Sequence, residues 1–264
     1  ALQGYESFTI KQSTSDHQAL TLIAPDTSIC TDCQEELQTP QDRRYKYPFI
    51  SCTNCGPRFS IIQQLPYDRA ATTMSSFPLC SQCRAEYENP ETRRFHAQST
   101  SCPDCGPTVR LTDDQGRQLN LQRPIEKAAS LLQAGKILAV KGLGGFHLVC
   151  TARDREVVQK LRARKERPAK PLAVMMKDIK TVKKYCRVTD QEAELLQGMR
   201  KPIVLVVNKD KLPVEIAPDT NQLGVMLPYT PLHYLLFTAG LEVVVATSAN
   251  RSGLPIEYEN RAAV

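Results

Sequence analysis

The chain has 264 residues and a formal net charge of +6, with 41% hydrophobic and 23% charged residues. This length suits about two ordinary domains, and the composition excludes a disordered tail or a collagen-like rod. No run of about 18 apolar residues occurs, so we expect no transmembrane helix. Residues 1–6 lack a signal-peptide pattern, and we expect them to be a cut edge of a longer chain. The positive charge suggests that the protein binds nucleic acid, and this hypothesis depends on where the charge lies along the chain.

The composition changes near residue 110. Residues 1–110 carry a net charge of −2 and eight of the ten cysteines, whereas residues 111–264 carry a net charge of +8. The polar segment 112–118 supplies turn residues at the change. We therefore predict a cysteine-rich region over 1–110, a linker over 111–123 and a second domain over 124–264.

The cysteine-rich region is an internal repeat with an offset of 50 residues. Each copy reads C-x2-C-x18-C-x2-C, and the flanking Arg43-Arg44-Tyr45 and Cys55-Gly56-Pro57 recur as Arg93-Arg94-Phe95 and Cys105-Gly106-Pro107. Two residues between paired thiolates let one tight turn present both sulfurs to a metal, and two such pairs complete a tetrahedral zinc site. The predicted ligands are Cys30, Cys33, Cys52, Cys55, Cys80, Cys83, Cys102 and Cys105.

We predict two structural zinc ions, one in each finger (30–55 and 80–105), with cross-braced pairing as an open alternative. A site closed by four ligands has no position for a substrate, and fingers of this size are expected to fold only with metal. Disulfides need an oxidising compartment, which nothing in the sequence signals, and a four-sulfur site also accepts iron. His96 is a fifth ligand candidate, but four thiolates already satisfy the ion, which favours a surface or interface role. Cys150 and Cys186 are expected to be buried, unreactive thiols.

From residue 124 onward, helical and strand periodicities alternate. We predict helices over 125–134, 154–165, 178–186, 189–198 and 230–240. A capping box opens the fourth of these helices, and a proline at the first position opens the fifth. We predict strands over 137–140, 172–176, 203–207 and 243–246. This alternation predicts an α/β sheet layered with helices.

Three loops of this domain are candidate ligand-binding segments. The first, 141–147, holds three glycines that let a ligand approach the backbone, although a plain tight turn explains it equally well. The second, 162–171, lies within a segment (153–187) of net charge +9. Its two prolines stiffen the backbone after the charges, which favours phosphate binding over a solvated helix face. The third, 247–250, follows a strand, where α/β sheets gather ligands; an ordinary turn is the alternative.

Motifs from both halves together resemble one family. The finger segments Arg-Arg-Tyr-Lys-Tyr-Pro-Phe (43–49) and Cys-Thr-Asn-Cys-Gly-Pro-Arg-Phe (52–59) resemble the HypF family, the carbamoyltransferase maturation proteins of nickel–iron hydrogenases. Lys165-Glu166-Arg167-Pro168 and Ser248-Ala249-Asn250 resemble its YrdC-like domain, shared with the threonylcarbamoyl-adenylate synthases of tRNA modification. The resemblance implies tandem fingers followed by a YrdC-like twisted mixed sheet with helices. It also implies that 124–264 is a nucleotide-binding domain, C-terminally truncated here.

The resemblance implies an enzyme of hydrogenase maturation. Carbamate, released from carbamoyl phosphate, is joined to ATP, giving carbamoyl-adenylate and pyrophosphate. The carbamoyl group then passes to the C-terminal cysteine of a partner maturation protein and becomes a cyanide ligand. The family's two outer domains lie outside this chain, so we expect it to be a fragment of the enzyme. The resemblance also implies a cytoplasmic protein with no membrane contact. Mg²⁺ is expected to arrive with ATP, because no acidic cluster offers a dedicated site.

The same resemblance assigns roles to single residues. The reactants are anions, so catalysis depends mostly on charge neutralisation and alignment. Lys165 and Arg167 are the catalytic candidates. The candidates for nucleotide and substrate binding are Lys141, Gly144, Gly145, His147, Lys170, Thr230, Ser248 and Asn250. A packed loop histidine explains His147 equally well, and Thr230 is also explained as a helix cap.

The alternative hypothesis is a zinc-dependent RNA-binding or tRNA-modifying YrdC-type protein, and a further one gives the fingers a scaffolding role only. The finger half is acidic and has few aromatic residues for base stacking, which opposes the RNA hypothesis. Eight thiolates and two zinc ions lower the net charge of the chain to about +2. The positive charge is thus concentrated in 153–187, which favours a nucleotide over a nucleic acid.

Overall fold

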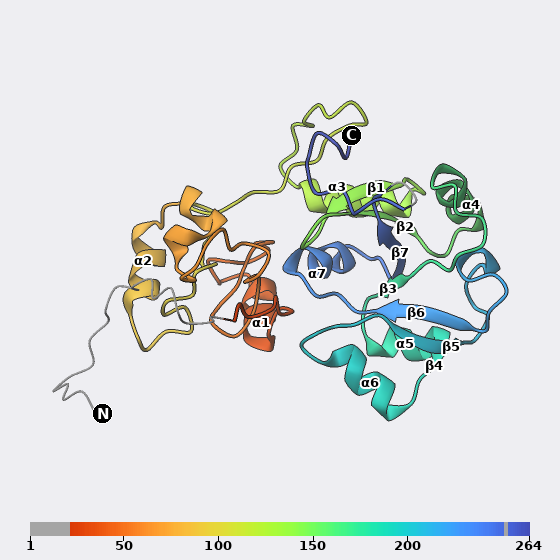
Figure 1. Ribbon diagram of the computed structural model, residues 1–264, viewed down its shortest axis with the longest axis horizontal. Helices are drawn as coiled ribbons and strands as arrows, with labels where there is room; N and C mark the ends of the chain where they lie inside the picture. The colour runs from red at the N-terminus through yellow and green to blue at the C-terminus, as the bar shows by residue number, and fades with distance from the viewer. Residues whose placement is uncertain (1–21, 251–252) are drawn as a thin grey trace.

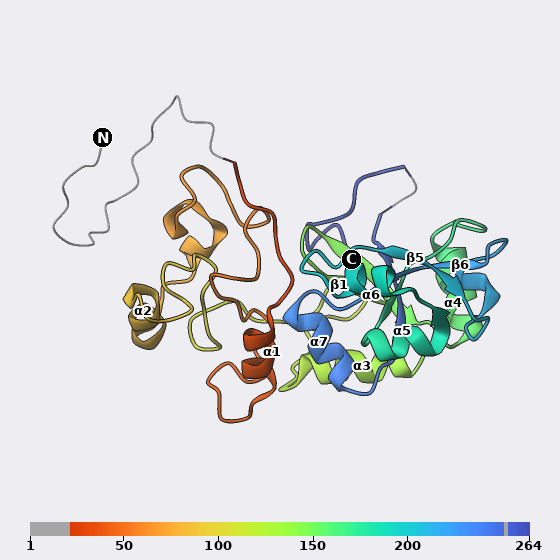
Figure 2. The same cartoon turned by 90° about the horizontal axis from the view of Figure 1, so that it is seen from below.

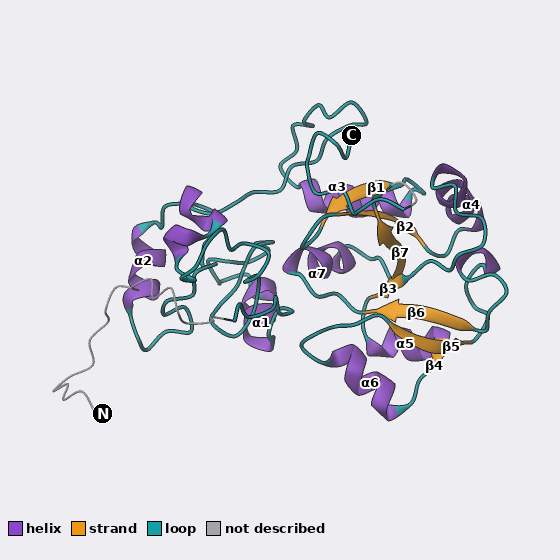
Figure 3. Cartoon of the chain, viewed as in Figure 1, coloured by secondary structure: helices purple, strands orange, loops and turns teal. Residues whose placement is uncertain are grey.

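The computed structural model describes residues 22–250 and 253–264 and has two parts along the chain (Figure 1). Loops dominate the finger region, and a seven-stranded sheet with helices forms the second part (Figure 3). The α-helices are α1 (Thr31–Gln38), α2 (Ser81–Glu88), α3 (Pro124–Gln133), α4 (Arg155–Arg164), α5 (Ile179–Tyr185), α6 (Asp190–Gln197) and α7 (Pro231–Thr238). The strands are β1 (Leu138–Lys141), β2 (Phe146–Thr151), β3 (Val174–Met176), β4 (Cys186–Arg187), β5 (Val204–Asn208), β6 (Gln222–Met226) and β7 (Val243–Ser248). Within the described ranges, none of the helices has the length and hydropathy that crossing a membrane requires.

The sheet has the strand order β1-β2-β7-β3-β6-β5-β4. Its neighbours pair in antiparallel fashion except β3 and β6, which run parallel. Successive residues of a strand point to opposite faces, so β7 directs Val243 and Val245 to one face and Val244 and Ala246 to the other. The predicted mixed sheet layered with helices is confirmed.

Each face of the sheet carries its own hydrophobic core. The first face packs against α4, α5 and α6, which contribute Val158, Leu161, Val182 and Leu196. The second packs against α3 and α7, which contribute Leu132, Leu236 and Phe237. Burying one such side chain fully stabilises the fold by about 1.5–3 kcal/mol. These two cores fix the ends of β2, β7 and α4 relative to one another.

Every helix predicted after residue 124 has a counterpart in α3–α7, and the predicted strands match β1, β3, β5 and β7. The prediction missed β2, β4 and β6. The segment 141–147 is therefore not one loop: Lys141 ends β1, and Phe146 and His147 begin β2. In β6, Gly224 interrupts the apolar pattern, and a glycine within a strand weakens its signal.

The finger region repeats its structure as it repeats its sequence. Helices α1 and α2 each begin one residue after the first cysteine of a finger. A glycine follows the last cysteine of each finger. At both positions the side chain of a neighbouring residue occupies the space that a Cβ atom would need. A Cβ at Gly56 would lie 2.7 Å from Ser51 Cβ, and one at Gly106 would lie 2.1 Å from the Tyr47 hydroxyl oxygen. Both turns therefore require glycine.

The first finger packs against the second part, with α1 between α2 and α7 in both views (Figures 1 and 2). The backbone N–H of Ser28 donates to the Met199 carbonyl, and that of Ile29 to the Tyr229 carbonyl, both at 3.1 Å. The apolar core of the finger continues onto α7 and includes Leu37, Tyr47, Ile50 and Leu235. The first finger is thus anchored on the α/β part. The second finger lies on the side of the first finger that faces away from the α/β part.

The segment predicted as a linker contains an ordered turn. The Asp113 carboxylate accepts hydrogen bonds from the backbone N–H groups of Gln115 and Arg117, at 3.0 and 2.9 Å. The Arg117 Nε also donates to this carboxylate at 2.8 Å. Side-chain acceptors of this kind stabilise turns. The domain boundaries at 110/111 and 123/124 remain predictions.

Candidate functional site

The eight predicted metal ligands form two separate clusters, and each cluster takes all four of its cysteines from one repeat. Within each cluster the sulfur atoms lie within 4.8 Å of one another. In the first, the Cys52 sulfur lies 3.7 Å from that of Cys30 and 3.8 Å from that of Cys55. In the second, the Cys102 sulfur lies 3.8 Å from that of Cys80 and 3.7 Å from that of Cys105. The pairing is in-repeat.

These distances fit a tetrahedral zinc ion. Four sulfurs bound at about 2.3 Å from a zinc ion lie about 3.8 Å from one another. Disulfide sulfurs lie about 2.0 Å apart, and all ten cysteines are free thiols. The donor set of four sulfurs is typical of a structural zinc site, and it leaves no coordination position for a substrate.

The predicted phosphate-binding residues converge on the C-terminal end of β7. The Lys165 ammonium donates to the Ser248 carbonyl and lies 3.4 Å from Asn250 Oδ1. Arg167 Nη1 donates to the Thr247 hydroxyl at 3.4 Å. The Ser248 hydroxyl donates to Asn250 Oδ1 at 2.7 Å. Residues from two distant segments of the sequence therefore form one group, which we call the lysine–arginine cluster (Lys165, Arg167, Ser248 and Asn250).

Neither cation of this cluster has an acidic partner among the residues that the structure describes. Of the ion pairs formed by residues 22–250 and 253–264, none involves Lys165 or Arg167. Burial, together with the charge of Arg167, lowers the pKa of Lys165. Burial also lowers the pKa of Arg167, and its buried Nε has no hydrogen-bond partner in the described part of the chain. Unpaired, half-buried cations with a free donor are suited to an anionic ligand.

The backbone at the end of α4 explains how both cations reach this place. The N–H of Glu166 donates to the Ala163 carbonyl at 3.2 Å, and the N–H of Arg167 donates to the Arg162 carbonyl at 3.1 Å. This pair of bonds is the Schellman motif, which needs a left-handed residue after the helix. Glu166 fills that position with φ +50°. The helix therefore ends sharply, with Lys165 and Arg167 on either side of the turn.

Arg162, which is not among the predicted site residues, shapes the rest of this loop. Its side chain is only 7% exposed. It donates to the backbone carbonyls of Arg167 at 2.7 Å and of Pro168 and Lys170 at 3.2 Å. It also donates to the carbonyls of Glu215 and Ile216 in the neighbouring loop. One buried guanidinium thus holds the loop that carries Arg167.

The glycine-containing turn lies beside the cluster. His147 pairs with Ser248 across β2 and β7, and the Ala249 N–H donates to the Phe146 carbonyl at 2.8 Å. A Cβ at Gly145 would lie 2.8 Å from the Glu257 carbonyl oxygen. Gly145 therefore lets the segment after β7 pass close to the turn, whereas Gly144 is exposed and has open space around it.

The other predicted binding residues lie in different surroundings. Lys141 donates to Asn260 Oδ1 at 2.8 Å. Lys170 is exposed, and only its backbone carbonyl contacts the loop-shaping Arg162. Thr230 caps α7, where its hydroxyl accepts from the His233 N–H at 3.2 Å. The structure does not bring these three side chains into the lysine–arginine cluster.

The remaining histidine and cysteine candidates lie outside the two metal clusters. His96 is half-buried and stacks near Tyr87, with 4.9 Å between ring centroids. Burial raises the pKa of Cys150 to about 12 and that of Cys186 to about 11. Both thiols are fully buried, in agreement with the expectation that they are unreactive.

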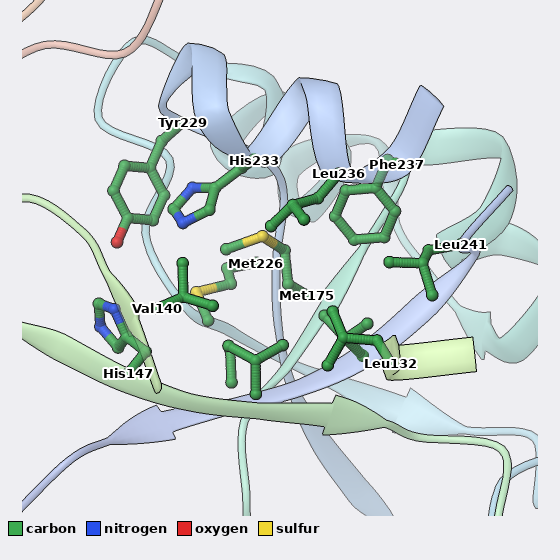
Figure 4. Close-up of a pocket in the computed structure, with 13 residues that line it drawn as sticks. Leu132, Val140, His147, Met175, Met226, Tyr229, His233, Leu236, Phe237 and Leu241 are labelled. Carbon is green, nitrogen blue, oxygen red and sulfur yellow. The ribbon is translucent and has the colours of Figure 1, made fainter. Parts of the chain in front are cut away.

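A small cavity lies between the sheet and α7 (Figure 4). His147 from β2 and His233 from α7 border it, together with Tyr229 and mostly apolar side chains. The cavity has room for about one water molecule, so it does not hold a nucleotide. Burial and, to a smaller extent, the charge of His147 lower the pKa of His233 to about 3. His233 is therefore a neutral core residue.

The buried His233 makes the fold sensitive to acid. Its native pKa of about 3 lies below the unfolded value of about 6.5, so the unfolded chain alone takes up a proton as the pH falls below about 6.5. At pH 5 the free energy of unfolding should be lower by about 2 kcal/mol for this reason. Urea unfolding of the wild type and of His233→Leu at pH 7 and pH 5 measures this loss. The zinc centres and carboxylates are common to both proteins, so an equal decrease in both would contradict the prediction.

Comparison with known proteins agrees with both parts of the chain. The family model Sua5/YciO/YrdC, described as "Telomere recombination", matches residues 130–264. The model described as "HypF finger" matches residues 29–62 and 79–112. The carbamoyltransferase HypF of Synechocystis is 52% identical over 262 residues, which cover 98% of this chain and 34% of that protein.

Two solved structures share this arrangement. One is a full-length HypF in a phosphate- and nucleotide-bound form, with a TM-score of 0.85 and 51% identity over 91% of this chain and 32% of that chain. The other is the HypF of T. kodakarensis, with a TM-score of 0.88 and 50% identity over the same shares of the two chains. The chain thus spans about a third of the length of these relatives. It belongs to the HypF family, of which it carries the pair of HypF fingers and the Sua5/YciO/YrdC domain.

Proposed function

We propose that this chain is the part of a hydrogenase-maturation carbamoyltransferase that binds ATP and forms carbamoyl-adenylate. The observation that carries the proposal is the lysine–arginine cluster, in which two cations converge on the end of β7 and form no ion pair within the described part of the chain. The relatives named carbamoyltransferase and the HypF relative solved with phosphate and nucleotide support the assignment. Mg²⁺ is proposed to enter as the complex with ATP.

The proposed reaction joins two anions. A carbamate oxygen, derived from carbamoyl phosphate, bonds to the α-phosphorus of ATP while the bond from that phosphorus to the bridging oxygen breaks and pyrophosphate leaves. Bringing carbamate and the ATP phosphates together concentrates negative charge, which Lys165 and Arg167 neutralise. The free Nε of Arg167 is a donor for a phosphate oxygen. Ser248 and Asn250 offer a hydroxyl and an amide for the sugar or the phosphate.

The glycine turn and His147 have supporting roles in this proposal. The turn with Gly144 and Gly145 lies next to the cluster, and His147 pairs with Ser248 on the adjacent strand. The product is proposed to pass to the C-terminal cysteine of a partner maturation protein in another part of the enzyme. The two fingers have a structural role, because four protein ligands leave their metal sites no open position for a substrate.

The test is the exchange of labelled pyrophosphate into ATP by the intact protein in the presence of carbamoyl phosphate. Lys165→Ala and Arg167→Ala should each lower the exchange rate by about 100- to 1,000-fold, as expected when a donor to developing charge is removed. Lys160→Ala, an exposed cation of the same helix, should exchange at the wild-type rate. Exchange that does not depend on carbamoyl phosphate, or that survives both substitutions, would refute the proposal.

A further inference from the structure

The repeated arginine pairs that flank the fingers cross from one finger to the other. Arg43, in the first finger, places Nη2 at 3.4 Å from the sulfur of Cys80 and 3.5 Å from that of Cys83. The adjacent Arg44 places Nη2 at 3.4 Å from the Cys83 sulfur. Two cations of the first finger therefore contact predicted zinc ligands of the second.

The second finger returns the contacts of Arg43 through its counterpart Arg93. Arg93 places Nη1 at 3.6 Å from the Cys33 sulfur and 3.9 Å from the Cys30 sulfur. Each residue in this set lies 50 positions from its counterpart in the other direction. The two fingers are thus related by a reciprocal exchange of arginines.

A carboxylate in each finger helix holds the incoming pair. Glu86 on α2 accepts from Arg43 at 3.3 Å and from Arg44 at 3.0 Å. Glu36 on α1 forms ion pairs with Arg93 and Arg94. The inner arginine of each pair is also buried, since Arg44 is 1% exposed and Arg94 is 6% exposed. Burial restricts the movement of these two side chains. The guanidinium groups of Arg43, Arg44 and Arg93 are therefore held beside the sulfurs.

The charges of the two groups are complementary. A zinc ion with four thiolates carries a net charge of −2, and a thiolate is a good acceptor for a charge-assisted hydrogen bond. An arginine pair with its glutamate contributes a net charge of +1 beside that centre. Groups that hydrogen-bond to metal ligands in this way typically change metal affinity by 10- to 100-fold when they are removed.

We propose that the arginines of each finger form the outer coordination shell of the other finger's zinc centre, so that each centre holds its ion more tightly while the arginines of the other finger are in place. This inference concerns the metal centres alone and is independent of the proposed adenylation.

The test follows cysteine exposure in the zinc-loaded chain. Arg43→Gln and Arg93→Gln are the variants of choice, because these two side chains are 25% and 31% exposed and their loss spares the buried Arg44 and Arg94 ion pairs. A chelating dye reports zinc release, while N-ethylmaleimide labels each freed cysteine for identification by peptide mass spectrometry. Arg84→Gln removes an exposed arginine of α2 and serves as the matched control.

The expected pattern is crossed. Arg93→Gln should make labelling of the four cysteines of the first finger about 10-fold faster, and Arg43→Gln should do the same for the second finger. Lysine at either position should restore part of the protection, because it keeps the charge and one donor. Wild-type labelling in both variants, faster labelling in the mutated finger itself, or equal labelling of both fingers would each overturn the proposal.

Discussion

Replacement of Cys33 by serine is expected to lower the zinc content of the chain from about two ions to about one, because each four-cysteine cluster holds one ion. Cys33 is fully buried, and its sulfur belongs to the cluster of the first finger. Structural zinc contributes about 10–16 kcal/mol to the folding of finger peptides. Loss of one ligand should therefore unfold the first finger rather than weaken it slightly.

The consequences should reach α7. Leu37 and Tyr47 of the first finger share a core with Leu235, so unfolding of the finger uncovers apolar surface of the α/β part. We expect increased binding of a hydrophobic dye in addition to the lost zinc. The second ion should also become easier to extract if the crossed arginines act as proposed.

Elemental analysis of the purified protein measures the first effect, and Cys150→Ala provides the control. Cys150 is also fully buried but lies in the core of the α/β part, so its substitution should leave two zinc ions in place. Two zinc ions in Cys33→Ser, or iron in place of zinc in the wild type, would contradict the assignment of the fingers.

The sequence predicted those parts of the site that depend on short-range spacing. The C-x2-C pairs sit 50 residues apart in two copies, and the structure groups them by copy. The motif around Lys165 and the motif around Ser248 were recognised separately, and their convergence follows from α4 and β7 lying against one core. Local chemistry and the alternation of elements were sufficient for these results.

Other features depend on contacts between distant residues and carry no local pattern. Arg162 looks like any other cation of a basic helix, and only burial against the carbonyl of Glu215, 53 positions away, distinguishes it. The arginine pairs were visible as repeats, but their targets lie in the other finger. One signal was available: Glu36 and Glu86 are also 50 residues apart, which points to a shared partner in each copy.

The missed strands have a comparable explanation. β2 begins directly after the glycine turn, and the glycines predict a turn that extends over its first residues. β4 has only two residues, Cys186 and Arg187, too few for a periodicity. These strands form only because β7 and β5 pair with them, so tertiary pairing decides their structure.

Replacement of Arg162 by methionine is expected to destabilise the α/β part and to abolish the proposed adenylation together. Methionine keeps much of the side-chain length but removes every donor to the five carbonyls that Arg162 contacts. Buried carbonyls that lose their partners raise the free energy of the folded state. The loss in the free energy of unfolding should be on the order of 3 kcal/mol.

The loop should respond as well as the global stability. Without the guanidinium, the carbonyls of Arg167 and Pro168 lose the donor that they share, so Arg167 should hold its position beside Thr247 less firmly. Urea unfolding followed by circular dichroism measures the stability, and pyrophosphate exchange in the intact protein measures the consequence for the cluster. Because Arg162 acts through Arg167, its loss should also weaken ATP binding at temperatures where the variant is still folded.

Arg164→Met is the matched control, because Arg164 lies two residues further along the same helix and is exposed. It removes the same charge and the same number of donors without opening a buried site, and surface substitutions of this kind change stability by about 0.5 kcal/mol or less. Equal unfolding curves for the two variants would show that Arg162 contributes only charge. A specific loss in Arg162→Met would instead show that this buried guanidinium positions the loop on which the cluster depends.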